Sequence, residues 1–265
     1  MALAYTAEEL DGVRARLQAA EIPFEALGDG ALRCRCPFGN LLRLEPWPSD
    51  RAQSWFGPAP VMDPRVERPL PGGPTSGLGM RWVRFDTPQG AAAPICDFYR
   101  EMFGAQAELL TDEDGHALCR VPIGFEQALE FRELAEGAPP LSPYDGHHVA
   151  VYTNRFDDIY ERLAAHGLVW NNPRFPHLTY DTLDDALRHN EFRIHDIVDP
   201  QTGAVIYTLE HEVRSLLHRG FSCRHWVEPR GAAMGTTAEG SACETDGENE
   251  ADGDEESSLA QADYY

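Results

Sequence analysis

Two adjacent histidines, His147 and His148, open the apolar stretch "HHVAVYT" and are the residues of this sequence most suited to metal chemistry. A third histidine, His195, and an acid, Glu130, lie in other segments in which apolar and polar residues alternate, as is typical of strands. Imidazole nitrogens and carboxylate oxygens are donors that bind zinc, iron, manganese or nickel in proteins. The first question is therefore whether these four side chains hold one divalent ion.

The elements that must position the histidine pair can be predicted from periodicity. Alternation in "HHVAVYT" predicts a strand with His148 and Tyr152 on one face. Apolar residues at helical spacing follow, and Gly167 ends that helix. An extended segment near "GLVWNNPRF" and the strands "FRIHDIVDP" and "AVIYTLEHEV", joined by the turn "DPQTG", come next. The order is strand, helix and three strands, with a short helix predicted at 180–189.

The same order occurs in two other parts of the chain. Residues 79–136 begin with the strand "MRWVRFDTP", continue with a helix in "APICDFYREMFG" and end with three strands. Residues 1–47 begin with "ALAYT", continue with the helix "AEELDGVRARLQAAEI" and end with a hairpin around Pro37–Asn40. The sequence thus predicts three βαβββ modules: an abbreviated one at 1–47, a second at 79–136 and a third at 142–220.

A repeated βαβββ module with a closing hairpin such as "DPQTG" resembles the vicinal oxygen chelate superfamily, which includes glyoxalase I, bleomycin and fosfomycin resistance proteins and extradiol dioxygenases. The resemblance covers residues 1–46 and about 79–220, and "GHHVAVYT", "FDDIYERLAAHGL" and "DPQTGAVIYTLE" are its most specific parts. It implies an α+β fold in which paired modules form a curved mixed sheet around a cavity. It also implies a divalent metal, held by a His, Gln or Glu of each first strand and a Glu of each last strand, that acts as a Lewis acid.

The positions that the resemblance assigns to metal ligands mostly carry other residue types. In the first module these positions are Met1 and Arg43. In the second they are Trp82 and the loosely aligned Glu130, and in the third they are His148 and Tyr207. A Trp indole only donates hydrogen bonds, a Tyr phenol has a pKa of about 10, and an Arg cation repels a metal ion. The metal site is therefore predicted to be incomplete.

Two glutamates of the last strand, Glu210 and Glu212, are candidate metal ligands in place of Tyr207. Glu210 and Glu212 lie on the opposite face from Tyr207 if the strand alternates strictly, so a register shift would be needed to bring either into its place. A set of His148, Glu130 and His195 stays open as an alternative ligand group.

Three functions stay open at this point, and the sequence leaves undecided whether the protein is an enzyme. A divergent member without metal or other cofactor would bind a small organic ligand. A member with one Zn, Fe, Mn or Ni ion would be a glyoxalase-like lyase or isomerase or an extradiol-type dioxygenase, with His147 or His195 as third ligand or general base. A non-enzymatic interaction protein is the third. The predicted pocket-lining residues are His148, Tyr152, Trp82, Arg84, Tyr207 and Leu209, with Arg174 as an alternative to Arg84.

Three modules are an odd number for a fold that pairs them. One module should therefore pack peripherally or pair across a homodimer. We expect the second and third modules to pair within the chain, because a short connection separates them, whereas the Pro- and Gly-rich linker at 48–78 follows the first.

Composition excludes several other classes of function. All 22 basic residues are arginine, so lysine Schiff-base chemistry is excluded, and the net charge of −22 argues against nucleic acid and anionic membranes as partners. The sequence contains no run of about 18 apolar residues and no signal-peptide pattern. Six cysteines are too sparse for a disulfide scaffold. We therefore expect a soluble protein of the cytoplasm.

The last segment of the chain differs in composition from the rest. Residues 229–265 are rich in Gly, Ser, Ala and acids, and no basic residue follows Arg230. Such a segment cannot bury enough apolar surface to offset the entropy lost on ordering, so it is predicted to be a disordered acidic tail.

We predict that deleting residues 229–265 leaves the melting temperature of the protein unchanged, because a disordered segment makes no contacts that the folded state loses. Thermal unfolding of the full chain and of the shortened chain, followed by circular dichroism, measures this. A melting temperature lower by many degrees in the shortened chain would show that the tail docks on the fold.

Overall fold

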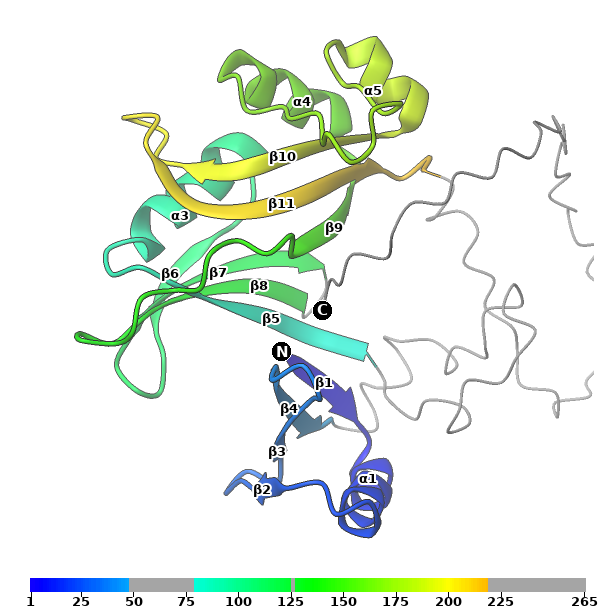
Figure 1. The fold of residues 1–265 in the computed structure, drawn as a ribbon, viewed down its shortest axis with the longest axis vertical. Helices are drawn as coiled ribbons and strands as arrows, with labels where there is room; N and C mark the ends of the chain where they lie inside the picture. The colour runs from blue at the N-terminus through cyan, green and yellow to red at the C-terminus, as the bar shows by residue number, and fades with distance from the viewer. Residues whose placement is uncertain (48–78, 125–126, 219–265) are drawn as a thin grey trace, which may run out of the picture. The chain divides into compact units, whose positions relative to one another are not determined.

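The computed structural model describes three stretches of the chain, residues 1–47, residues 79–136 without 125 and 126, and residues 137–218, whose strands and helices are drawn in Figure 1. The predicted linker at 48–78 and the predicted tail at 229–265 lie outside the described residues. The first described stretch contains β1 (Ala2–Tyr5), α1 (Ala7–Ala19), β2 (Phe24–Ala26), β3 (Leu32–Arg35) and β4 (Leu41–Pro46).

Helix α1 begins at a capping box and packs on this first group of strands. The Thr6 hydroxyl accepts a hydrogen bond from the Glu9 backbone N–H at 3.2 Å, and the Glu9 carboxylate accepts one from the Thr6 N–H at 3.0 Å. Both interactions satisfy N–H groups that would otherwise have no partner at the helix start. The apolar face of α1 is buried in a small core made by Leu10, Val13, Leu32, Cys34 and Leu44.

The second described stretch repeats this order of elements. It contains β5 (Gly79–Thr87), α3 (Ala92–Phe98), the π-helical turn η1 (Tyr99–Phe103), β6 (Glu108–Thr111), β7 (Ala117–Gly124) and β8 (Gln127–Glu133). Gly104 ends η1 with a φ of 62°, a left-handed conformation that glycine adopts without strain.

The third described stretch has one strand fewer than predicted. It contains β9 (His148–Thr153), α4 (Phe156–Ala165), α5 (Leu183–His189), β10 (Glu191–Val198) and β11 (Val205–Ser215). The short helix predicted at 180–189 is confirmed as α5. The segment "GLVWNNPRF" forms only an isolated bridge between Val169 and Ile194, and Pro173 in this segment lacks the N–H that a strand ladder needs. No helix in the described ranges has the length and apolar character to cross a bilayer.

Eight strands form one mixed sheet, in the order β2-β3-β4-β1-β5-β8-β7-β6, and three form another, in the order β10-β11-β9. Parallel and antiparallel neighbours occur in both sheets, which is the α+β class predicted from the sequence. In the large sheet, β1 lies parallel to β4, β5 lies parallel to β8, and the antiparallel pair β1 and β5 joins the two halves.

The pairing of β1 with β5 corrects the prediction that the second and third modules share a sheet. Ala2 lies opposite Trp82, and the side chains of Ala2 and Ala4 are completely buried. The long intervening segment does not prevent this pairing, because the entropy cost of closing a loop rises only slowly with its length. The pairing between β1 and β5, and not the number of residues between two modules, therefore decides which modules share a sheet.

A β-bulge interrupts β11 and changes which of its residues share a face. Ile194 lies opposite His211 and Asp196 lies opposite Thr208, so β11 has one residue more than β10 between these pairs. An inserted residue reverses the alternation of side chains beyond it. The prediction that Glu212 lies on the opposite face of this strand from Tyr207 assumed strict alternation and is therefore wrong.

The second and third stretches share a hydrophobic core in which α3 and η1 lie between the two sheets (Figure 1). At its centre the Tyr99 hydroxyl donates to His211 Nε2 at 2.6 Å, and His211 Nδ1 donates to the Leu209 carbonyl at 2.8 Å. Both rings are almost completely buried. Burial lowers the pKa of His211 to about 4 and raises that of Tyr99, so both side chains are neutral at pH 7.

We predict that His211 makes the fold less stable in mild acid. Its pKa is about 4 in the folded chain against 6.5 for the free side chain, so the unfolded chain takes up a proton first as the pH falls. The stability is fully present above about pH 6.5 and is lost progressively down to about pH 4, by roughly 3 kcal/mol in total. Denaturant unfolding at a series of pH values measures this loss.

The variant His211→Gln is the matched comparison, because a Gln amide can still accept from Tyr99 and does not titrate. Its unfolding free energy should change less between pH 6.5 and pH 4 than that of the original chain, by roughly the same 3 kcal/mol. Equal pH dependence in the two proteins would contradict the assignment.

Candidate functional site

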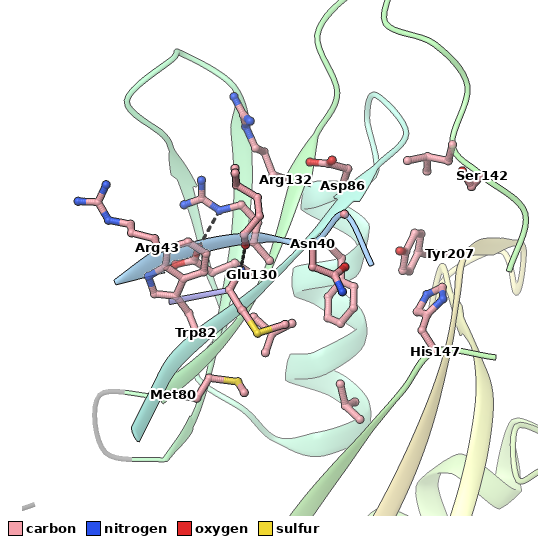
Figure 2. A pocket seen from close by; sticks show the side chains of 18 of the residues that line it. Asn40, Arg43, Met80, Trp82, Asp86, Glu130, Arg132, Ser142, His147 and Tyr207 are labelled. Atoms are coloured by element: carbon pink, nitrogen blue, oxygen red, sulfur yellow. Dashed lines mark hydrogen bonds and ion pairs between the residues drawn. The ribbon is translucent and has the colours of Figure 1, made fainter. Parts of the chain in front are cut away.

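The polar face of the eight-stranded sheet forms one side of an open cavity of about 1320 Å³. Strands β3, β4, β5, β7 and β8 contribute to its wall, and the segment before β9, the start of β9 and β11 close it on the other side (Figure 2). The cavity therefore takes side chains from all three described stretches of the chain.

A row of three charged side chains runs across the floor of this cavity. Glu130 on β8 lies opposite Arg84 on β5 and opposite Arg120 on β7, and residues directly opposite each other in a sheet share a face. Arg84 Nε donates to Glu130 Oε2 at 2.9 Å, and Arg120 Nη1 donates to Glu130 Oε1 at 2.6 Å. Glu130 is only 1% exposed, and a carboxylate so enclosed needs cationic partners.

Trp82 supports one end of this row. The Cζ atom of Arg84 lies 4.8 Å from the centre of the Trp82 ring, within the range of a cation–π contact. Together with Glu130, the indole fixes the plane of the Arg84 guanidinium. Figure 2 shows Trp82 and Glu130 side by side on the same side of the cavity.

His147 lies on the opposite side of the cavity, close to Tyr207 (Figure 2). A carboxylate can only accept, so the 2.8 Å contact between His147 Nδ1 and Asp145 Oδ1 places the proton on Nδ1. The hydrogen bond from His147 lowers the pKa of Asp145. His147 Nε2 is buried and has no partner among the described residues. With the proton on Nδ1, the Nε2 atom can accept a hydrogen bond from a ligand.

Two further cavity residues complete this side. Burial raises the pKa of Tyr207 to about 12, so its hydroxyl stays protonated and can donate a hydrogen bond to a ligand. The His148 side chain is 53% exposed, and its Nε2 lies 3.9 Å from Glu212 Oε1. His148 is among the residues that line the cavity.

The glutamates near His148 belong to a buried ionic network that the sequence did not predict. Arg193 contacts the carboxylates of Glu191, Glu210 and Glu212 at 3.0, 2.5 and 2.8 Å, and Arg214 pairs with Glu191 and Glu212. Burial alone would raise the pKa of Glu210, but hydrogen bonds from Arg193 and Asn172 outweigh it and lower that pKa. Alternating acids and arginines in "EFR" and "EHEVR" are the sequence signal that could have revealed this network.

The predicted pocket-lining residues separate into two groups. Trp82, Arg84, Tyr207 and His148 lie around the cavity. Leu209 is completely buried in the core, because the bulge in β11 changes the alternation. The predicted wall therefore loses this residue.

Three other candidates also lie away from the cavity. The Tyr152 hydroxyl accepts from Arg214 Nη1 at 3.4 Å on the far part of β9. His195 and Arg174 line a second, smaller pocket of about 160 Å³, where the His195 ring lies 4.8 Å from that of Trp170. The alternative ligand set of His148, Glu130 and His195 is thus not brought together.

The residues that occupy the expected ligand positions do not fit a metal ion. Both Glu130 oxygens accept from positively charged guanidinium groups, which would repel a cation. Arg43 pairs with Glu45 at 2.7 Å, and Trp82 has no acceptor to offer. In the parts of the chain that the structure describes, no three His, Cys, Asp or Glu side chains are grouped so that they could hold an ion.

No family model and no curated protein sequence matches this chain. Among solved structures, a mutant glyoxalase I from Zea mays is similar over 81% of this chain and 68% of its own, with 12% identity and a TM-score of 0.46. A mutant of the fosfomycin resistance protein FosX from Listeria monocytogenes is similar over 51% and 90%, with 14% identity and a TM-score of 0.33. A glyoxylase/bleomycin resistance protein/dioxygenase domain from Frankia sp. EAN1pec is similar over 53% and 94%, with 16% identity and a TM-score of 0.32.

These structural neighbours are members of the vicinal oxygen chelate superfamily, which the sequence also resembles. At such identities and TM-scores the similarity carries no conclusion about activity. The chemistry of this chain has to rest on its own residues.

We predict that the purified protein contains well under one equivalent of zinc, iron, manganese or nickel, because Arg, Trp and Tyr side chains offer a divalent ion poor donors. Elemental analysis of the original chain and of His148→Ala should give the same low metal content. A stoichiometric metal that disappears in His148→Ala would instead favour the lyase or dioxygenase alternative, with Glu130 and His195 as the next residues to replace.

Proposed function

We propose that this protein binds a small organic molecule in the 1320 Å³ cavity, using arginine side chains in place of a bound metal. The observation that carries this proposal is the row Arg84, Glu130 and Arg120, in which a buried carboxylate holds two guanidinium groups in fixed positions beside Trp82. Side chains locked by their neighbours lose little entropy on binding a ligand, which is the usual character of a preformed site.

The composition of the wall also supports a small-molecule site. Apolar and aromatic surface from Trp82, Phe85 and Tyr207 combines with a few polar groups, the balance found in ligand pockets. The polar groups come from opposite sides, since the arginines lie on the sheet and His147 lies across the cavity. A ligand between them could meet hydrogen-bonding groups at both ends.

The element order supports the interpretation of the chain as three βαβββ modules, the third of which has lost one strand. In this interpretation the first and second modules form the sheet, and the third covers one side of the cavity. A homodimer and a location in the cytoplasm stay predictions from the sequence.

Tryptophan fluorinated at ring position five offers a direct test of cavity occupancy. Trp82 lies in the large cavity and Trp170 lies in the smaller pocket, so their fluorine signals report on the two places separately. Each signal can be assigned from the variants Trp82→Phe and Trp170→Phe. Screening a fragment library of acids, bases and neutral molecules by fluorine NMR should yield compounds that shift the Trp82 signal and leave the Trp170 signal in place. A library that gives no such compound, or only compounds that shift both signals equally, would refute the proposal.

A further inference from the structure

We infer that the ligand of the cavity is an organic oxyanion, a carboxylate or phosphate group on a small apolar body, and that Arg84 and Arg120 together bind its oxygens. This inference rests on the proposed function and names the chemical class of the molecule bound. It depends on three properties of the arginine row: its charge, its free donors and its surroundings.

The charge of the row is positive. Two guanidinium groups share the single carboxylate of Glu130, which leaves one positive charge at the floor of the cavity. A partly buried positive charge of this kind attracts an anion. In a chain with a net charge of −22, a local excess of this sign is not explained by composition.

The two arginines of the row also have N–H groups that Glu130 does not use. Each guanidinium has five N–H groups, and the contacts with Glu130 use only Nε of Arg84 and Nη1 of Arg120. No nitrogen of either arginine is both buried and without a partner among the described residues, and the two side chains line the cavity with 21% and 31% of their surface exposed, so unused N–H groups can be reached from the cavity. Planar pairs of N–H groups match the two oxygens of a carboxylate or phosphate.

Three other arginines of the cavity, Arg33, Arg43 and Arg132, are paired with acids, and Arg35 donates to the Gly39 carbonyl at 2.8 Å. Arg132 contacts Asp112 at 2.5 Å and Asp114 at 2.8 Å, so one cation faces two carboxylates there. Asp86, which lies opposite Arg132 in the sheet, adds a further negative charge on that side. An anion is therefore attracted to Arg84 and Arg120 and repelled from the neighbourhood of Arg132.

Trp82 indicates what the rest of the ligand is like. The indole lies against the Arg84 guanidinium, and Met80, 40% exposed, lies on the same strand at the cavity wall. Apolar surface next to two cationic groups suits a molecule that has an anionic end and a flat or aliphatic body.

Benzoate and benzamide make a matched pair of probes, because they have nearly the same shape and differ in charge. With the protein fluorinated at its tryptophans, benzoate should shift the Trp82 signal at a concentration about tenfold lower than benzamide needs, the effect of one added charge-assisted hydrogen bond. Phenylphosphonate should behave like benzoate, and added sodium chloride should weaken both anions and leave benzamide unaffected.

Variants then assign the preference to particular residues. Arg84→Gln and Arg120→Gln should each weaken benzoate binding about tenfold or more. Arg132→Gln removes the same charge from the same cavity but should leave benzoate binding unchanged, because its guanidinium is already paired. Arg84→Lys keeps the charge without the planar fork and should lose part of the affinity. If one glutamine variant fails to fold, as its melting curve would show, the other decides the question.

The outcomes separate this inference from the proposal beneath it. Equal binding of benzoate and benzamide, or equal losses in Arg84→Gln and Arg132→Gln, would overturn the oxyanion inference while leaving a small-molecule cavity in place. Failure of every fragment of any charge to move the Trp82 signal would overturn the proposed function itself.

Discussion

A carboxylate enclosed in a β-sheet has to be matched by a cation, and in this chain every such cation is an arginine. The cost of burying an unpaired charge is several kcal/mol, so the partner cannot be absent. Glu130 is matched by Arg84 and Arg120 in the large sheet, and three glutamates are matched by Arg193 and Arg214 in the small sheet. In the large sheet the Glu130 carboxylate fixes two guanidinium groups, and in the small sheet the Arg193 guanidinium fixes three carboxylates. The charged floor of the cavity follows from the first of these arrangements.

The same constraint explains why Glu130, whose two oxygens both accept from guanidinium groups, is poorly suited to bind a metal ion. An arginine presents its positive charge through several directed N–H groups, whereas a metal ion presents it from one point. A metal ion also dissociates if its ligands are removed. Guanidinium groups are also covalently part of the chain and remain charged at every physiological pH. The positive charge at the floor of the cavity is therefore permanent and independent of any supply of metal from outside.

Much of the fold could be predicted from local patterns, because the period of two and the period of 3.6 residues show where strands and helices run. The short helix α5 was predicted in this way. The bulge at Leu209 could not be, since an inserted residue depends on how β11 meets β10. Arg120 was missed for a related reason: its partner Glu130 is a cross-strand neighbour, and sequence spacing does not give register.

The join between β1 and β5 has a further consequence for how this architecture could be shortened. Residues 1–47 supply the strand that pairs with the Gly79–Trp82 part of the edge of β5, and with it the arginines on that side of the cavity. A chain without them would present unpaired backbone N–H and C=O groups along β5 to any other strand in solution. Deletion of the first module would thus leave an edge strand open to pairing, and a strand from a second polypeptide could take the place of β1.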